Sequence, residues 1–354
     1  MASWSVRAIR TIAAAPFLFI AVWCAREMDL QKIAANQQPF EESGVIEWDG
    51  GKISITEGFY KVDIFNKLFF GGTATFSPAT FGYDAVSWWQ LFAFLVDLGP
   101  VYTVWILESY RTGIAYTPMY FPTIFTFAGQ MLGLGPVAPV FYCLYFIFGP
   151  TASGMAASPV RDRTVWRGNG GVLLLVVFLF HTAEVFAMFL APDFEIRHYW
   201  TWAWQLTPIW IGVGNLFLST IVAPFLPKTN MIAPPKILTA VLGLFSAGVW
   251  GYTLLFSPYS LSTLLIPAVG PQSEFITHCR KAFQADYIGV LGSSLLWLVY
   301  SFFDLGSVGL LGRNWFYYVA LLPVVTALVG PGAAFILGWY LRERALSVKR
   351  NQST

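Results

Sequence analysis

Two ionisable side chains, His181 and Glu184, lie close together in the otherwise apolar run VVFLFHTAEVFAMFLAP, residues 176–192. An ionisable side chain at the centre of a membrane helix costs roughly 2.5–3.5 kcal/mol on insertion scales, and residues retained at that cost usually pair, handle ions or do chemistry. A carboxylic acid with no cationic partner in an apolar site stays protonated near neutral pH and can donate its proton. Glu184 is therefore a candidate general acid, and His181 could hydrogen-bond to it or tune it.

A second candidate acid lies in the run WWQLFAFLVDLGPVYTVWILESYR, residues 88–111. Asp97 stands in its middle with no cation nearby in the sequence, so the same argument applies to it. Glu108, by contrast, precedes Arg111 at the (i, i+3) spacing of a helical ion pair. The sequence predicts that Arg111 keeps Glu108 ionised, which suits a structural or hydrogen-bond-accepting role. Arg111 is also a candidate substrate contact.

Uncharged side chains in the apolar runs supply further candidate substrate contacts. The rings of Tyr102 and Trp105 could face a developing cation, because an aromatic face attracts positive charge through its quadrupole. The amides of Gln130, Gln205 and Asn215 could contact a substrate, although such amides more often join helices to one another. Both interpretations of the amides stay open on the sequence alone.

The composition requires lipid as the solvent for the elements that carry these residues. The chain of 354 residues is 56% hydrophobic and 18% aromatic but only 11% charged, with a mean hydropathy of +0.60, whereas a soluble domain carries about 25% charged residues. We predict a single integral membrane domain over residues 1–354, with an all-α fold that forms a polytopic membrane helical bundle. Apolar runs near ~20 residues are candidate spans, and about eight are expected, at residues 8–25, 86–107, 120–149, 170–191, 201–225, 236–256, 286–304 and 316–340.

Some segments depart from simple spans. The run 120–149 is too long for one ordinary span and is expected to break at GLGP, residues 133–136. A second broken or re-entrant piece is expected near 258–270. Residues 26–85 form a polar loop, in which FYKVDIFNKLFF (59–70) is amphipathic and could lie along the membrane surface.

Basic residues set the expected orientation in the membrane. They occur before the first span, in the loop 150–169 and in the C-terminal tail, as Arg7, Arg10, Arg161, Arg163, Arg167, Arg342, Arg344, Lys349 and Arg350. Because cytoplasmic segments carry an excess of Lys and Arg, both the N-terminus and the C-terminus are expected on the cytosolic side. The expected location is the endoplasmic reticulum membrane, and the loop reaches the cytosolic side only if 120–149 folds as a hairpin.

The sequence lacks the usual signatures of metal and nucleotide sites. It has three histidines and three cysteines, no aspartate-rich pair in its helices, and none of the patterns GxxxxGK[ST], GxSxG, HExxH or a strand-following GxGxxG. We therefore expect no metal and no cofactor. With a net charge of +2 and no basic arm, the expected partners are a lipophilic small-molecule substrate and membrane lipid, and no nucleic acid.

Three stretches together resemble a known enzyme family. They are WILESYR (105–111), FPTIFTFAGQMLGLGPVAPVFYCLYFIF (121–148) and FHTAEVFAMFLAP (180–192). In them the chain is similar to the fungal integral-membrane terpene cyclases of meroterpenoid biosynthesis, in particular the type that acts on epoxidised farnesyl-phenols in the ascofuranone and ascochlorin routes. The likeness covers about residues 85–225 and is a pattern of polar residues in hydrophobic helices.

The resemblance implies a metal-free, acid-initiated cyclisation of a lipophilic prenylated aromatic. A carboxylic acid, Glu184 or Asp97, would protonate the epoxide and open it. His181 would tune the acidity of that acid or reprotonate it. Glu108 would accept a hydrogen bond from a substrate hydroxyl or take the final proton. Three alternatives stay open: a sterol-type membrane double-bond isomerase, a proton-coupled transporter, and a receptor or scaffold whose polar residues only join helices.

Overall fold

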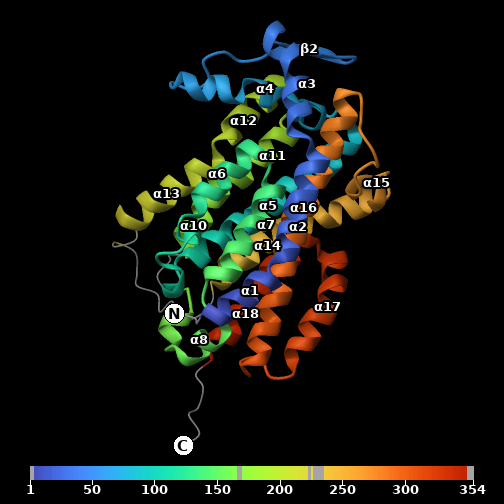
Figure 1. Cartoon of the computed structure of the whole chain (residues 1–354). Coiled ribbons are helices and arrows are strands. Elements are labelled where there is room, and N and C mark those ends of the chain that lie inside the picture. Colours follow the sequence, from blue (N-terminus) through green and yellow to red (C-terminus); the bar gives the residue numbers. More distant parts are fainter. Residues whose placement is uncertain (1–3, 166–169, 222–224, 226–234, 349–354) are drawn as a thin grey trace, which may run out of the picture.

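In the computed structural model the chain folds as an elongated bundle of helices with a small β-hairpin at one end (Figure 1). The structure describes residues 4–165, 170–221, 225 and 235–348, so the basic residues Arg167, Lys349 and Arg350 lie outside it. The first elements are α1 (Trp4–Ala13), α2 (Ala15–Met28), α3 (Leu30–Ser43), β1 (Val45–Trp48), β2 (Gly51–Ser54), α4 (Asp63–Thr80), α5 (Ala85–Ser109), η1 (Thr112–Ile114), η2 (Pro118–Tyr120), α6 (Pro122–Leu132), α7 (Leu134–Phe148), α8 (Ala152–Ala157) and α9 (Val160–Arg163). The later elements are α10 (Gly170–Val177), the π-helical turn η3 (Phe178–Thr182), α11 (Ala183–Leu190), α12 (Phe194–Gln205), α13 (Thr207–Ile221), α14 (Lys236–Phe256), α15 (Leu261–Leu265), α16 (Phe275–Ser307), α17 (Asn314–Val329) and α18 (Pro331–Ser347).

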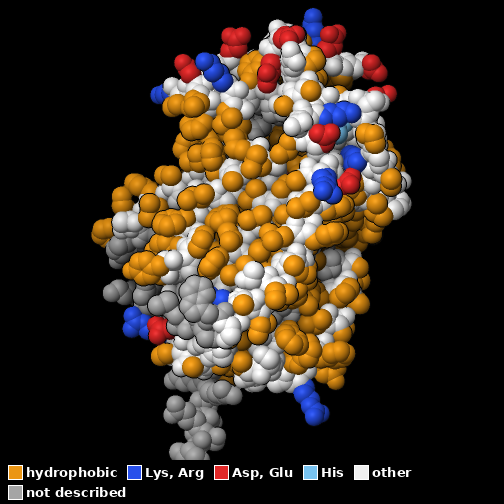
Figure 2. Space-filling model, viewed as in Figure 1, with side chains coloured by type: hydrophobic (Ala, Val, Ile, Leu, Met, Phe, Trp, Pro, Cys, Tyr) orange, Lys and Arg blue, Asp and Glu red, His pale blue; other side chains and the backbone are white. Residues whose placement is uncertain are grey.

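The middle of the bundle is largely apolar on the face drawn in Figure 2. Figure 2 shows hydrophobic side chains over most of this face and charged side chains gathered at the hairpin end. In the described part of the chain, helices long and apolar enough to cross a membrane are Ser5–Ser43, Ala85–Ser109, Val172–Leu190, Lys236–Phe256 and Phe275–Ser307. The helical membrane character is therefore supported by these five helices, and the predicted number of about eight spans is not confirmed.

The boundaries of several predicted spans differ from the helices. The first helical stretch runs from Ser5 to Ser43, through residues that the sequence assigned to the polar loop. Helix α16 begins at Phe275, eleven residues before the predicted run 286–304. The run 316–340 divides at Gly330, which joins α17 to α18 with a φ of +87°, a backbone conformation that glycine adopts without strain.

The predicted break at GLGP is confirmed. Helix α6 ends at Leu132, α7 begins at Leu134, and Gly133 between them has a φ of +79°. A Cβ on Gly129 would lie 3.1 Å from the Cα of Leu134, so the two helices meet at a sharp bend. The segment 258–270 contains the short helix α15, which packs against α5 and α16.

The hairpin is a departure from the predicted all-α fold. Strands β1 and β2 pair antiparallel, with Trp48 opposite Gly51 and the two residues Asp49 and Gly50 forming the turn. Asp-Gly is a common sequence for a two-residue hairpin turn, and in this structure neither Asp49 nor Gly50 has a positive φ. The amphipathic segment 59–70 that follows is helical from Asp63 onward, within α4.

Helix α5 lies at the centre of the bundle. Its apolar window is fully buried, and it packs against α4, α14, α16 and α18. A helix that is hydrophobic all round is one that neighbours cover on every side. The polar residues of α5 therefore meet other helices rather than lipid.

His198 connects the polar segment after the hairpin to α12, outside the candidate spans. Its Nε2 accepts hydrogen bonds from the Thr56 backbone N–H at 3.2 Å and from the Trp202 indole at 3.1 Å. Burial lowers the pKa of His198 to about 4, against about 6.5 for a histidine in an unfolded chain. Between these two values the unfolded state binds the extra proton, so folding stability falls as the pH is lowered.

We expect His198 to make the protein acid-sensitive. In detergent, thermal unfolding followed by tryptophan fluorescence should show a stability loss between pH 6.5 and 4 that approaches a slope of about 1.4 kcal/mol per pH unit. His198→Gln retains an acceptor oxygen but does not titrate, so this part of the pH dependence should disappear. An unchanged slope in the variant would contradict the prediction.

Candidate functional site

A partly open cavity of about 250 Å³ lies between the helices, beside α5. Its walls come from α2, α3, α4, α5, α12 and α16 and from the bend between α6 and α7. Most of the lining is apolar and includes Phe76, Phe94, Leu98 and Trp204. An apolar cavity with a few convergent polar groups is the usual form of a small-molecule site, so this cavity is the candidate site.

Two glutamines predicted as substrate contacts meet in this cavity. Gln130 donates its Nε2 to the Oε1 of Gln205 at 2.7 Å, and both side chains line the cavity. The Nε2 of Gln205 is buried and has no hydrogen-bond partner among the described residues. A buried donor without a partner costs about 1–3 kcal/mol. A ligand that carries an acceptor would recover that cost.

Asp286 is a carboxyl in the same cavity that the sequence analysis missed. One of its oxygens, Oδ1, accepts the backbone N–H of Gly135, in the first turn of α7. Asp286 is 8% exposed, it lines the cavity, and it has no ion-pair partner in the described part of the chain. Tyr102, a predicted contact, lines the cavity from α5. The polar groups that line the cavity thus include one carboxyl, an amide pair and a phenol.

Asp97 lies outside this cavity, in a contact between helices. It accepts hydrogen bonds from the Ser246 hydroxyl at 2.5 Å, the Tyr287 hydroxyl at 2.8 Å and the Gly332 backbone N–H at 3.1 Å. Gly332 is in the first turn of α18, where the backbone N–H groups favour an anion. The structure therefore engages Asp97 as an acceptor that joins α5 to α14, α16 and α18.

Glu184 and His181 do not bond to each other. Glu184 accepts the Thr207 hydroxyl at 2.6 Å. His181, in the π-helical turn η3, has its Nε2 at 2.8 Å from the Leu95 carbonyl, which can only accept, so Nε2 carries the proton. Its Nδ1 is buried without a partner among the described residues, and its ring lies edge-on to Tyr102 at 5.3 Å. Neither residue lines the 250 Å³ cavity.

The predicted ion pair between Glu108 and Arg111 is confirmed at 2.7 Å, and it belongs to a larger buried cluster. Arg342 also contacts Glu108 at 2.7 Å, and Glu343 contacts Arg111 at 2.6 Å. The Trp339 indole donates to Glu108 at 2.7 Å. All four charged residues are at most 1% exposed, so Arg342 is part of the core and not of a basic cytosolic tail.

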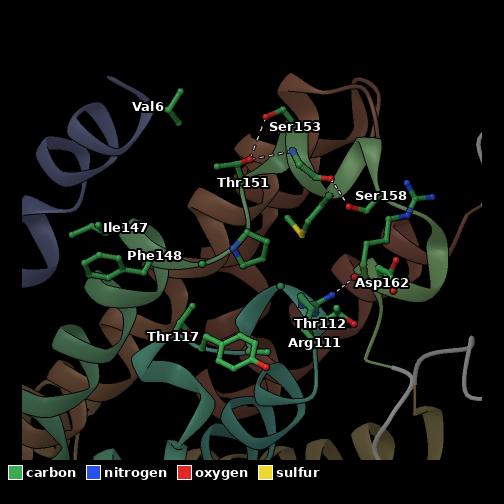
Figure 3. A pocket seen from close by; sticks show the side chains of 18 of the residues that line it. Val6, Arg111, Thr112, Thr117, Ile147, Phe148, Thr151, Ser153, Ser158 and Asp162 are labelled. Carbon is green, nitrogen blue, oxygen red and sulfur yellow. Dashed lines mark hydrogen bonds between the residues drawn. The ribbon is translucent and has the colours of Figure 1, made fainter. Parts of the chain in front are cut away.

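A second cavity, of about 1040 Å³, lies next to this charge cluster. Figure 3 shows Arg111, Thr112 and Asp162 on one side of it and Thr151 and Ser153 on the other. Its lining is rich in hydroxyl groups. Arg111 is occupied by Glu108, Glu343 and a backbone carbonyl, so it presents no free charge to the cavity.

The two remaining predicted contacts serve packing. Trp105 stacks on Phe141 with ring centroids 3.9 Å apart and donates its indole N–H to Tyr142 at 2.9 Å. Asn215 donates to the Tyr110 hydroxyl at 2.5 Å. Of the predicted site residues, the structure therefore brings Tyr102, Gln130 and Gln205 together in one cavity and places the others elsewhere.

Asp286, Arg342 and Glu343 are the important residues that the sequence analysis did not single out. Asp286 was placed at the very start of the predicted run 286–304, where an acid needs no explanation, and α16 shows it well inside a helix. The signal was present in FQADYIGV, since this acid is flanked by apolar residues on both sides.

Comparisons with known proteins give two curated relatives and no solved structure. The chain is 28% identical over 353 residues to a protein of Penicillium polonicum named FAD-dependent monooxygenase verC1. This alignment covers 97% of this chain and 43% of the relative. It is 25% identical over 263 residues to FAD-dependent monooxygenase BOA8 of Botryotinia fuckeliana (strain B05.10). This second alignment covers 71% of this chain and 33% of the relative. The chain thus spans less than half the length of either relative. No solved structure matches.

These names correct the expectation drawn from the terpene-cyclase resemblance. Both relatives are named as flavin-dependent oxidative enzymes, so acid-initiated cyclisation of a prenylated aromatic is not supported. The alternatives of a sterol-type isomerase and a proton-coupled transporter are not supported either.

The family itself follows from a direct match. The CtvD domain matches residues 54–241, more than half of the chain, and the chain belongs to the CtvD domain family.

Proposed function

We propose that this chain is the membrane-embedded, substrate-holding component of an enzyme system that oxidises a lipophilic metabolite with the help of a flavin. The observation that carries the proposal is the alignment of nearly the whole chain, 97%, with less than half, 43%, of a protein named as an FAD-dependent monooxygenase. The cavity beside α5 supports the same role, because apolar walls with a few polar groups suit a lipophilic ligand.

The residues of this chain do not fit FAD itself. A dinucleotide site of the usual kind needs a parallel strand, a glycine-rich turn and a helix whose N-terminus receives the pyrophosphate. The described residues contain two strands, β1 and β2, and these form one short antiparallel hairpin. The 250 Å³ cavity lies below the roughly 300–1,000 Å³ of pockets for drug-sized ligands. The larger cavity is lined by Arg7, Arg111 and Arg163. Arg111 is already paired with Glu108 and Glu343, and Arg163 donates to the carbonyls of Leu346 and Val348, so Arg7 is the lining cation left for a pyrophosphate among the described residues.

The chain's own part in the proposed system is therefore binding. The cavity holds a lipophilic molecule beside α5 and shields it from water, while the flavin belongs to protein outside this chain. A first test is the flavin content of the purified full-length chain in detergent with added FAD. We expect no stoichiometric FAD fluorescence after denaturation, and one FAD per chain would overturn the proposal.

A second test examines metabolites in the native host. The gene is deleted, cultures are grown under isotopically labelled dioxygen, and lipophilic extracts are compared by mass spectrometry. We expect the loss of at least one labelled metabolite and the accumulation of a precursor that lacks the added oxygen. The intact gene should restore the product, and so should Gln90→Met, because Gln90 is buried but does not line the cavity. Accumulation of an already oxygenated compound would place the chain after the oxidation and contradict the proposal.

A further inference from the structure

We infer that the 250 Å³ cavity binds an uncharged lipophilic molecule that carries a hydroxyl group for Asp286 and an acceptor oxygen, such as a carbonyl or ether, for Gln205. This inference rests on the proposed substrate-holding role and specifies the ligand of the same cavity. It follows from two hydrogen-bonding groups of the lining that the protein leaves unused, the Nε2 of Gln205 and one oxygen of Asp286. The Trp204 indole N–H and the Tyr102 hydroxyl, which also line the cavity, have no partner among the described residues either, and both can donate to a ligand oxygen.

Gln205 offers a donor. Its Oε1 is already used by Gln130 at 2.7 Å, which fixes the orientation of the amide and leaves the Nε2 hydrogens without a partner among the described residues. This nitrogen lies 3.6 Å from the position that a Cβ on Gly72 would take, and Gly72 also lines the cavity. A donor with no protein partner, beside a wall that lacks a side chain, matches an acceptor oxygen on the ligand.

Asp286 offers an acceptor. Its Oδ1 holds the Gly135 N–H, and its other oxygen makes no hydrogen bond or ion pair in the described part of the chain. The carboxyl also lies at the first turn of α7, the positive end of that helix. The Gly135 N–H and the positive helix end favour the carboxylate form of Asp286, unlike an apolar site that offers no such groups, and the same helix end disfavours an added cation. A hydroxyl group therefore suits Asp286 better than an ammonium group does.

The remaining walls exclude a strongly polar ligand. Phe76, Leu91, Phe94, Leu98 and Phe283 line the cavity with hydrocarbon. Of the other polar residues that line it, Gln37 donates to the Thr75 hydroxyl at 2.8 Å, and Thr75 donates in turn to the Gly71 carbonyl. A ligand with two polar groups and an apolar body forms hydrogen bonds at these positions and brings no further charge into the apolar cavity.

The test uses the full-length chain in lipid nanodiscs and a radiolabelled 4-hydroxyphenyl alkyl ketone as the probe. Three matched compounds compete with it: the methoxy analogue, which lacks the donor, the alkylphenol, which lacks the carbonyl, and a 4-alkylbenzylamine, which is a cation. We expect saturable binding of the hydroxyketone, and binding of the first two competitors weaker by about threefold to tenfold, as for the loss of one hydrogen bond. The cation should compete least. Equal competition by the methoxy analogue, or preferred binding of the amine, would overturn the inference.

Two variants assign the contacts. Asp286→Asn keeps an acceptor for the Gly135 N–H but changes the group that faces the ligand, so the preference for hydroxyl over methoxy should shrink. Gln205→Met should remove the preference for the ketone over the alkylphenol. Gln90→Met, the same change at a buried glutamine that does not line the cavity, should alter neither preference. Should a variant fail to fold, the competitor series on the natural protein still decides the outcome.

If hydroxyl preference is absent while gene deletion still removes the oxygenated metabolite, only the ligand inference fails. If binding is as expected but the metabolites are unchanged, only the proposed function fails.

Discussion

Glu108→Gln is expected to destabilise the protein by about 3–5 kcal/mol, because it removes one partner of a buried ionic cluster and leaves an uncompensated charge. The natural carboxylate forms ion pairs with Arg111 and Arg342 and accepts hydrogen bonds from the Trp339 indole and the Tyr145 hydroxyl. The amide has nearly the same shape, so the loss reports charge and hydrogen bonding rather than packing. Unfolding in detergent, followed by tryptophan fluorescence against temperature and denaturant, measures it.

A second substitution separates charge balance from shape. Arg342→Met in the Glu108→Gln background restores a neutral cluster, so we expect the double variant to be more stable than the sum of the two single effects predicts. The ion pair between Glu27 and Lys281, at 2.8 Å with Glu27 32% exposed, is the matched control. Glu27→Gln should change stability by less than about 1 kcal/mol. A cluster variant that behaves like this control would contradict the prediction.

Gly289→Ala is expected to cost about 3 kcal/mol or to prevent folding, since overpacking typically costs 1–3 kcal/mol and here the obstacle is backbone. A Cβ at this position in α16 would lie 2.7 Å from the carbonyl oxygen of Gly135 and 2.8 Å from its Cα. It would also lie 2.9 Å from the sulfur of Cys24. Small residues at such crossings let membrane helices approach closely, so α2, α7 and α16 would have to separate.

Gly292, in the same helix, provides the control. A Cβ there would have no atom within 4 Å, so Gly292→Ala should be neutral or should stabilise the helix by about 0.5–1 kcal/mol. Expression level, monodispersity in detergent and the unfolding midpoint of the two variants can be compared directly. Equal behaviour of the two alanines would show that the crossing is less tight than the structure indicates.

The parts of the fold that the sequence predicted depend on local signals. The apolar runs marked the membrane helices, GLGP marked the bend at Gly133, and the (i, i+3) spacing identified the pair of Glu108 with Arg111. The hairpin was missed although Asp49-Gly50 is a strong local turn signal, because the whole polar stretch 26–85 between apolar runs was interpreted as a loop. Helix ends were the least predictable, since hydropathy does not show where a helix continues past the lipid.

The candidate site was predictable only in its residue types. Amides in apolar helices were recognised as candidates, but nothing local shows that Gln130 meets Gln205, 75 positions away. The partners of Asp97 are equally remote, so an acid that looked unpaired in the sequence is hydrogen-bonded three times in the fold. Arg342 was interpreted as part of a cytosolic tail because its acidic partner Glu108 lies 234 residues earlier.

The central position of α5 has a consequence for biosynthesis. Helix α5 leaves the ribosome with Asp97 and Glu108 before most of the chain exists. The first ion-pair partner of Glu108, Arg111, follows three residues later. The groups that donate hydrogen bonds to Asp97 follow much later, since Ser246, Tyr287 and Gly332 lie 149, 190 and 235 residues further along the chain. During translation α5 is therefore made with an acid whose donors do not yet exist, and the bundle can close around it only after α18 has been synthesised.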